Sequence, residues 1–216
     1  MKNRFLIILL IVLVCNNIVS AQFRTGRFGR GFGAQKNGRP RRQQQLFKPT
    51  LDLSVGYGYP NLDKDLLPEF TSYYKGNISQ SGPVTLALNY RFMQRMSVGV
   101  MVMNGKTSVP YYDYTNSGTQ AFTGSLENTA IVLNIMKYVP VNGKISPYVR
   151  TAIGLNIWKQ NYVDNRGNHI NPGVVLPDLA YQAAFGLKIN LSNNAGLFAE
   201  AGYGKYILHG GLSLKL

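Results

Sequence analysis

The sequence predicts an all-β fold, an eight-stranded antiparallel up-and-down transmembrane β-barrel. Apolar residues alternate with small or polar ones, segment after segment, which is the period of a β-strand and excludes a helical stripe. Long and short connections between these segments alternate along the chain, as in bacterial membrane barrels. The face opposite the apolar one carries mainly Gly, Ala, Ser, Thr and Asn, whereas a water-soluble barrel would place Lys and Glu there.

Length and composition agree with one such domain and a tail. The chain has 216 residues, of which 45% are hydrophobic and 15% charged, with 23 Gly, 14 Tyr and 10 Phe. Abundant glycine and aromatic residues favour short strands and argue against a helical bundle. Cys15 is the only cysteine and lies in a segment that we expect to be removed. Disulfides, thiol catalysis and cysteine-based metal sites are therefore not expected.

Residues 1–21 have the pattern of a cleaved signal peptide. Lys2 and Arg4 precede an apolar run over 5–15, and small residues over 19–21 suit cleavage after Ala21. The alternative is a retained anchor helix, but the run is shorter than the ~20 apolar residues needed to span a bilayer.

Residues 22–48 form a basic segment that we expect to be disordered. It holds eight Lys or Arg and no acidic residue, and nothing in it can form a core. Residues 49–216, the predicted barrel, carry only 13 basic and 9 acidic residues, so most of the net charge of +14 precedes them. The segment could meet anionic lipid headgroups as a solvated linker. Nucleic acid is not expected as a partner of an exported protein.

The predicted strands share period-two alternation. They cover 51–59, 84–92, 96–103, 125–138, 148–157, 178–191, 197–203 and 208–216. Segment 125–138 is apolar on both faces in its middle, although Asn128, Ala130 and Asn134 favour the even positions as its polar face.

The connections favour one orientation. Stretches near 60–81, 104–124 and 159–177 are long, and those near 93–95, 139–146 and 192–196 are short, which predicts outer loops and periplasmic turns. An even number of strands then puts both termini in the periplasm. A soluble exported barrel of lipocalin type, which binds a ligand and has its apolar face inward, is the competing fold.

The chain resembles the small eight-stranded outer-membrane β-barrel proteins of OmpX, OmpA-barrel and PorT type. The resemblance covers roughly 50–216 and rests on the signal peptide, the eight alternating strands and the ending Gly210-Gly211-Leu212-Ser213-Leu214-Lys215-Leu216. It implies a bacterial outer-membrane protein surrounded by lipid, whose terminal strand over 207–216 is read by the barrel-insertion machinery. Family members usually end on an aromatic residue, and Leu216 departs from that pattern.

The resemblance implies a fold more than an activity, because its members include adhesion, envelope-integrity and secretion-accessory proteins. We therefore expect a non-enzymatic barrel with a structural or interaction role. It should have no open pore, catalytic residue, cofactor or metal. A lipid-active enzyme is the alternative, for which His209, Glu200 and Ser213 are the candidate residues.

Two sets of residues are candidate sites. In the lumen, Glu200 falls on the inward face and needs a cation, because an unpaired carboxylate is costly to bury. Arg150, Lys188 and Arg91 face inward by the same parity, and Arg150 is the expected partner in an ion-pair network. A contact surface for an extracellular or envelope protein is expected in the long loops, at Tyr73, Tyr74, Tyr111, Tyr112, Tyr114, Tyr162 and His169.

Overall fold

A computed structural model describes residues 47–115, 118–139, 144–170 and 173–216. The described residues belong to one compact unit, which spans residues 45–216. The predicted signal peptide over 1–21 and all but Phe47 and Lys48 of the basic segment over 22–48 lie outside the described residues. Within these ranges, no helix is long and apolar enough to span a bilayer.

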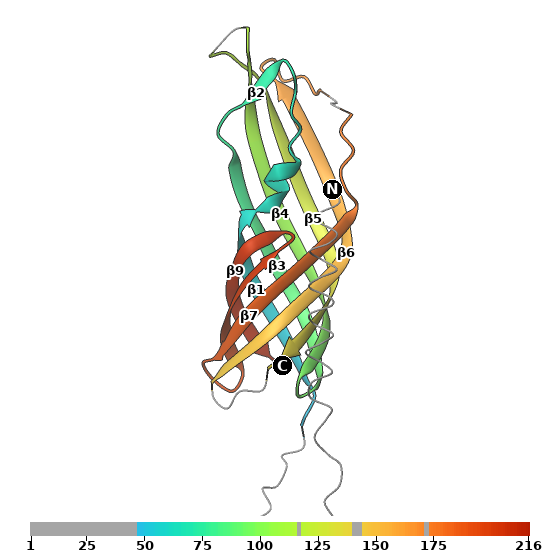
Figure 1. The fold of residues 1–216 in the computed structure, drawn as a ribbon, viewed down its shortest axis with the longest axis vertical. Helices are drawn as coiled ribbons and strands as arrows, with labels where there is room; N and C mark the ends of the chain where they lie inside the picture. The colour runs from blue at the N-terminus through green and yellow to red at the C-terminus, as the bar shows by residue number, and fades with distance from the viewer. Residues whose placement is uncertain (1–46, 116–117, 140–143, 171–172) are drawn as a thin grey trace, which may run out of the picture. The chain divides into compact units, whose positions relative to one another are not determined.

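The described chain forms a closed barrel of eight antiparallel strands, which confirms the predicted fold class. The barrel strands are β1 (Thr50–Asn61), β3 (Ser79–Met93), β4 (Met96–Asp113), β5 (Gln120–Tyr138), β6 (Ile145–Asp164), β7 (Leu179–Asn190), β8 (Ala195–Tyr203) and β9 (Tyr206–Lys215). Each pairs with the next, and β1 pairs with β9 to close the cylinder (Figure 1). A 3-10 helix η1 (Leu62–Leu66) and a short strand β2 (Tyr73–Lys75) lie between β1 and β3.

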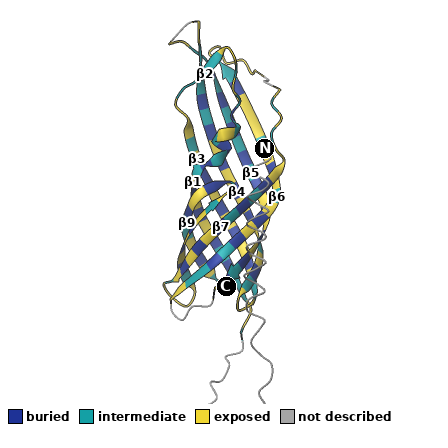
Figure 2. Cartoon of the chain, viewed as in Figure 1, coloured by how far each residue is buried: buried dark blue, intermediate teal, exposed yellow. Residues whose placement is uncertain are grey.

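The barrel is polar inside and apolar outside. Figure 2 shows buried and exposed residues alternating along the strands. On β5 the even positions 128–136 are buried, while Ile131, Leu133 and Ile135 are exposed, so the ambiguous segment has the polar face that was favoured. On β1, Asp52 and Ser54 are buried, whereas Val55 and Tyr57 are about half exposed. Such a sheet is stable only where lipid surrounds it, and the strands are therefore transmembrane.

Strands β4, β5 and β6 are longer than predicted. Pairing of β6 with β7 ends at Leu155, but its pairing with β5 continues to Asp164. Pairing of β4 with β5 likewise continues to Tyr112. These strands rise beyond the closed barrel as an open sheet, and β2 pairs with the edge of β4 (Figure 1). The prediction of long loops was therefore wrong for most of 104–124 and for 159–164, while the described residues of 165–177 lie outside the strands.

The open sheet, which we call the extension, reverses the polarity of the barrel. Its inner face packs an apolar cluster formed by Leu67, Val109, Tyr111, Phe122, Leu126 and Tyr162. Its outer face carries the cross-strand row Lys106, Glu127 and Lys159. Because an apolar inner and a charged outer face suit water, the extension lies beyond the lipid.

Candidate functional site

The lumen contains three buried acidic residues, each paired with a buried base. Lys188 Nζ lies 3.2 Å from Asp52 Oδ1, Arg150 Nη2 lies 3.1 Å from Glu200 Oε1, and Lys205 Nζ lies 2.8 Å from Asp63 Oδ1. The first pair lies where β1 begins and the last lies at η1, near the opposite end of the closed barrel. Each pair joins parts of the chain that are far apart in sequence.

Glu200 is the centre of the middle pair. Its carboxylate accepts hydrogen bonds from Tyr148 Oη at 2.6 Å and from Tyr206 Oη at 2.9 Å, and His209 Nδ1 lies 3.0 Å away. With Arg150, four donors surround this carboxylate. Burial of the charge is therefore compensated by both an ion pair and hydrogen bonds, as a low-dielectric site requires.

The register of four strands explains how these side chains meet. Tyr148 on β6 lies opposite Gly186 on β7, Gly186 lies opposite Glu200 on β8, and Glu200 lies opposite His209 on β9. A Cβ atom added to Gly186 would lie 2.5 Å from Tyr148 Cζ. The missing side chain of Gly186 therefore leaves the space through which the Tyr148 hydroxyl reaches Glu200.

Arg150 depends on Glu200 for its counter-charge. It also contacts the thioether sulfurs of Met101, 3.1 Å from Nη1, and Met136, 3.6 Å from Nη2, and its guanidinium lies 6.0 Å from the centre of the Tyr148 ring. Thioether sulfur is a weak acceptor, and the Nε of Arg150 has no hydrogen-bond partner. The side chain is 2% exposed, so water does not replace these partners.

The structure brings Arg150 to Glu200 but does not bring Lys188 or Arg91 there. Lys188 on β7 pairs with Asp52, which faces inward on β1, with β8 and β9 between these two strands. Arg91 lies at the end of β3, where its guanidinium stacks over the Tyr138 ring at 4.3 Å and donates to the carbonyl of Gln94. The prediction of a single network over these four residues was wrong, because the lumen separates its charges into pairs along the barrel.

Polar contacts cross the end of the closed barrel near η1. Asp63 accepts from Lys205 and from Asn128 Nδ2 at 2.9 Å, and Asn128 also donates to Asn156 Oδ1 at 3.1 Å. The ammonium group of Lys205 lies 4.8 Å from the centre of the Trp158 ring. The 3-10 helix is thus connected to β5 and to the turn between β8 and β9 through a side chain in its first turn.

A triad-like arrangement lies within the lumen. His209 Nε2 is 2.7 Å from Thr85 Oγ1, while its Nδ1 faces Glu200. In one tautomer the ring donates a hydrogen bond from Nδ1 to the carboxylate and accepts one from the threonine hydroxyl at Nε2. Ser213, the nucleophile considered from the sequence, instead donates to the carbonyl of Gly196, and Thr85 is only 2% exposed. The arrangement therefore links β3, β8 and β9 through buried side chains.

The predicted contact surface divides into two groups. Tyr111 and Tyr162 are 0% and 2% exposed within the extension core, so their assignment to a contact surface was wrong. Burial raises the pKa of both phenols, and Tyr111 donates to the carbonyl of Pro68 at 2.7 Å. Tyr73 also packs inward, with its ring 5.1 Å from that of Phe122.

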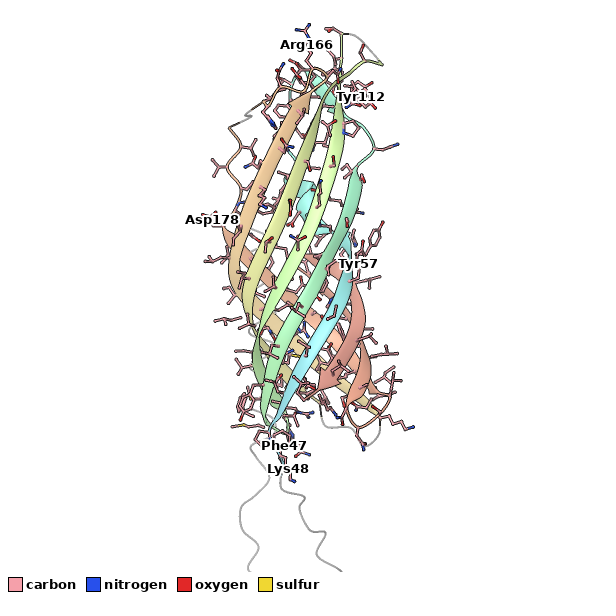
Figure 3. All side chains as sticks on the ribbon, turned by 180° about the vertical axis from the view of Figure 1, so that it is seen from behind. Phe47, Lys48, Tyr57, Tyr112, Arg166 and Asp178 are labelled. Carbon is pink, nitrogen blue, oxygen red and sulfur yellow. The ribbon has the colours of Figure 1, made fainter. Side chains whose placement is uncertain are left out.

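Three tyrosines remain together near the tip of the extension. The ring of Tyr74 stacks on Tyr112 and lies beside Tyr114, at 5.4 Å from each, and Tyr114 is 60% exposed. Figure 3 shows Tyr112 at the end of the molecule opposite Phe47 and Lys48. We call Tyr74, Tyr112 and Tyr114 the tyrosine cluster. His169 is exposed and bonds Asn161 at 2.9 Å.

Among the described residues, no group of three or more His, Cys, Asp or Glu side chains could hold a metal ion. Two acidic side chains between β1 and β3 already have protein partners. Asp63 pairs with Lys205 and accepts a hydrogen bond from Asn128, and the Glu69 carboxylate lies 3.7 Å from Lys75 Nζ at the surface.

Comparisons with known proteins give weak structural similarity only. No protein-family model matches the chain, and no curated protein matches it. One similar solved structure comes from the de novo design of transmembrane β-barrels; it is 18% identical, covers 77% of this chain and 95% of that one, and has a TM-score of 0.42. Ail, the attachment invasion locus protein of Yersinia pestis, is similar at 13% identity, over 77% of this chain and 94% of its own. Its TM-score is 0.41 in the complex with the heparin analogue sucrose octasulfate and 0.39 in a second crystal structure. Similarity at this level carries no argument about function.

Proposed function

We propose that the protein is a bacterial outer-membrane barrel without an open pore, with a structural or interaction role and with both termini in the periplasm. The observation that carries the proposal is the arrangement of polarity: paired charges fill the lumen, and apolar side chains cover the outside.

The apolar outer surface favours a membrane over water. Leu133 and Leu155 are each 64% exposed and Ile153 is 60% exposed, and the exposed apolar residues continue around all eight barrel strands. Soluble proteins do not leave so large a continuous apolar area in water. A lipocalin-like barrel would have these side chains inward, so the soluble alternative is not supported.

The filled lumen argues against conduction. Met101, Met103, Tyr148 and Phe198 are buried between the charge pairs, and Asp63 of η1 pairs with Lys205 at one end. Eight strands enclose a space that side chains can fill completely. A lipid-active enzyme would need an accessible nucleophile, whereas Thr85 and Ser213 both face this filled lumen.

An interaction role is supported by the tyrosine cluster. Rigid amphipathic rings contribute contact area at low entropic cost, and here three of them occupy the tip of the extension. An extracellular or envelope protein would meet this tip, while the strand over 207–216 would present its alternating pattern to the barrel-insertion machinery.

The decisive experiment compares gel mobility of the bacterial membrane fraction with and without heating. A folded membrane barrel should migrate differently before and after boiling and should be absent from the soluble fraction. Abundant soluble protein without a heat-dependent shift would contradict the proposal. Protease digestion of intact cells and of opened envelopes then tests the orientation, since a tag placed after Ala21 should be cut only in opened envelopes.

A further inference from the structure

The end of the barrel where the chain enters and leaves is strongly basic. Six cationic residues belong to it: Lys48, Arg91, Arg95, Lys137, Lys144 and Lys215. They come from the start of β1, the end of β3, the turn before β4, the end of β5, the start of β6 and the end of β9. The only described carboxylate side chain at this end is Asp52, which is neutralised by Lys188. We call the six residues the basic rim.

The opposite end has no such excess. Its described cations are Lys64, Lys75, Lys106, Lys159, Arg166 and Lys205, and its described anions are Asp65, Glu69, Asp113, Glu127, Asp164, Asp178 and Asp63. Figure 3 places Lys48 at one end of the molecule and Arg166 at the other. Charge is therefore segregated along the barrel axis, and this end alone presents an uncompensated positive field.

The rim adjoins the edge of the apolar band. Exposed apolar residues lie beside its outward cations: Val139 follows Lys137 by two positions on the same face, and Ile145 follows Lys144. Lys215 has the inward parity of Ser213 and lies at the mouth of the lumen, one position before the exposed Leu216. Lysine side chains in this position extend beyond the hydrocarbon and place their ammonium groups at the level of lipid phosphates. A soluble polyanion would not require the cations to follow the edge of the band.

We infer that the basic rim binds phospholipids whose headgroups carry a net negative charge, and that it does so in the leaflet next to the chain termini. The inference rests on the proposed function, which places the apolar band in a bilayer. Charge complementarity selects the ligand, because each phosphodiester meets several cations and, among the described side chains, no unpaired carboxylate.

Two charge-matched variants of the full mature chain test the inference. The rim variant carries Lys48→Gln, Lys137→Gln, Lys144→Gln and Lys215→Gln. The control variant carries Lys64→Gln, Lys106→Gln, Lys159→Gln and Arg166→Gln, so it loses the same charge at the other end and keeps the same basic segment. Each protein in neutral detergent is mixed with equimolar dioleoyl phosphatidylglycerol and dioleoyl phosphatidylcholine, and retained lipid is counted by native mass spectrometry.

The wild-type and control proteins should retain more phosphatidylglycerol than phosphatidylcholine. In the rim variant, the ratio of retained phosphatidylglycerol to phosphatidylcholine should be at least about tenfold lower than in wild type. The preference should also fall as salt is raised. Equal preference in the rim and control variants, or no preference in wild type, would overturn the inference.

The same proteins distinguish failure of the inference from failure of the proposed function. Insertion into phosphatidylcholine vesicles, read as a heat-dependent gel shift, is expected of all three. If insertion succeeds and the lipid preference is absent, only the inference fails; if wild type does not insert, the membrane placement itself is wrong.

Discussion

Replacing Glu200 by alanine should destabilise the barrel strongly. The change leaves the Arg150 guanidinium beside two thioether sulfurs, with no carboxylate to neutralise it. Breaking a buried ion pair by removing one partner costs about 3–5 kcal/mol. Tyr148, Tyr206 and His209 lose an acceptor as well, at about 1–3 kcal/mol for each donor left unsatisfied, although these costs do not add independently. We therefore expect a loss of at least about 3 kcal/mol.

The loss can be measured as urea unfolding in detergent, with the folded fraction read from the heat-dependent gel shift. With a slope of about 1–3 kcal/mol per molar urea, the midpoint should fall by about 1 M or more. Glu127→Ala is the matched control, since it removes the same residue type from the outer face of β5, and it should shift the midpoint much less.

A double-mutant cycle separates the ion pair from general packing. Arg150→Met removes the buried charge, so Glu200→Ala in that background should cost about 2 kcal/mol less than in wild type. An unchanged midpoint for Glu200→Ala, or additive effects in the cycle, would refute the reasoning that Glu200 compensates Arg150.

Three further predictions concern packing, conduction and one loop. Gly186→Ala should destabilise the barrel by about 1–3 kcal/mol, because its Cβ would collide with Tyr148. Gly210→Ala is the control: its Cβ would make only an ordinary van der Waals contact, so its midpoint in the same urea titration should equal that of wild type. Planar bilayers containing the protein should show no reproducible open-channel steps of uniform size, and such steps would contradict the filled lumen. Hydrogen bonds from Asn168 lower the pKa of Asp164 below its ordinary value of 3.8; because the folded-state pKa is lowered, the Asn168 amide should be protected from exchange above that value. Protection should be lost as the pH falls through the lowered pKa, and exchange that does not vary with pH, beyond its intrinsic dependence, would count against this role.

The number of strands and the inward or outward orientation of their side chains could be predicted, because successive residues alternate between the lipid, which favours apolar side chains, and the lumen, which accepts polar ones. Ser54 and Asn134 face inward and Val55 and Leu133 face outward, as their polarity indicates. The meeting of Arg150 with Glu200 also followed from parity, since both face one narrow space. Asp52 faces inward by the same parity, so its pairing with Lys188 left a signal in the sequence that the single-network hypothesis overlooked.

The extension could not be predicted because the rule that identified the strands reverses there. Val109 and Tyr111 face inward and Lys106 faces outward, which is the pattern of a sheet in water. The ion pair between Asp63 and Lys205 joins residues 142 positions apart, and no local pattern indicates such a contact. Likewise, the row from Tyr148 through Gly186 to Glu200 depends on the register between strands, which alternation alone leaves open.

The outward direction of the apolar face is tested most directly by spin labels along β5. Because Cys15 is the only cysteine and precedes the predicted cleavage site, each single cysteine introduced over 131–136 would be unique in the mature chain. In vesicles, oxygen accessibility of the nitroxide should be high at 131, 133 and 135 and low at 132, 134 and 136, matching the exposed and buried positions. Low oxygen accessibility at 131, 133 and 135, or access of a water-soluble relaxation agent to those positions, would contradict a lipid-facing apolar surface.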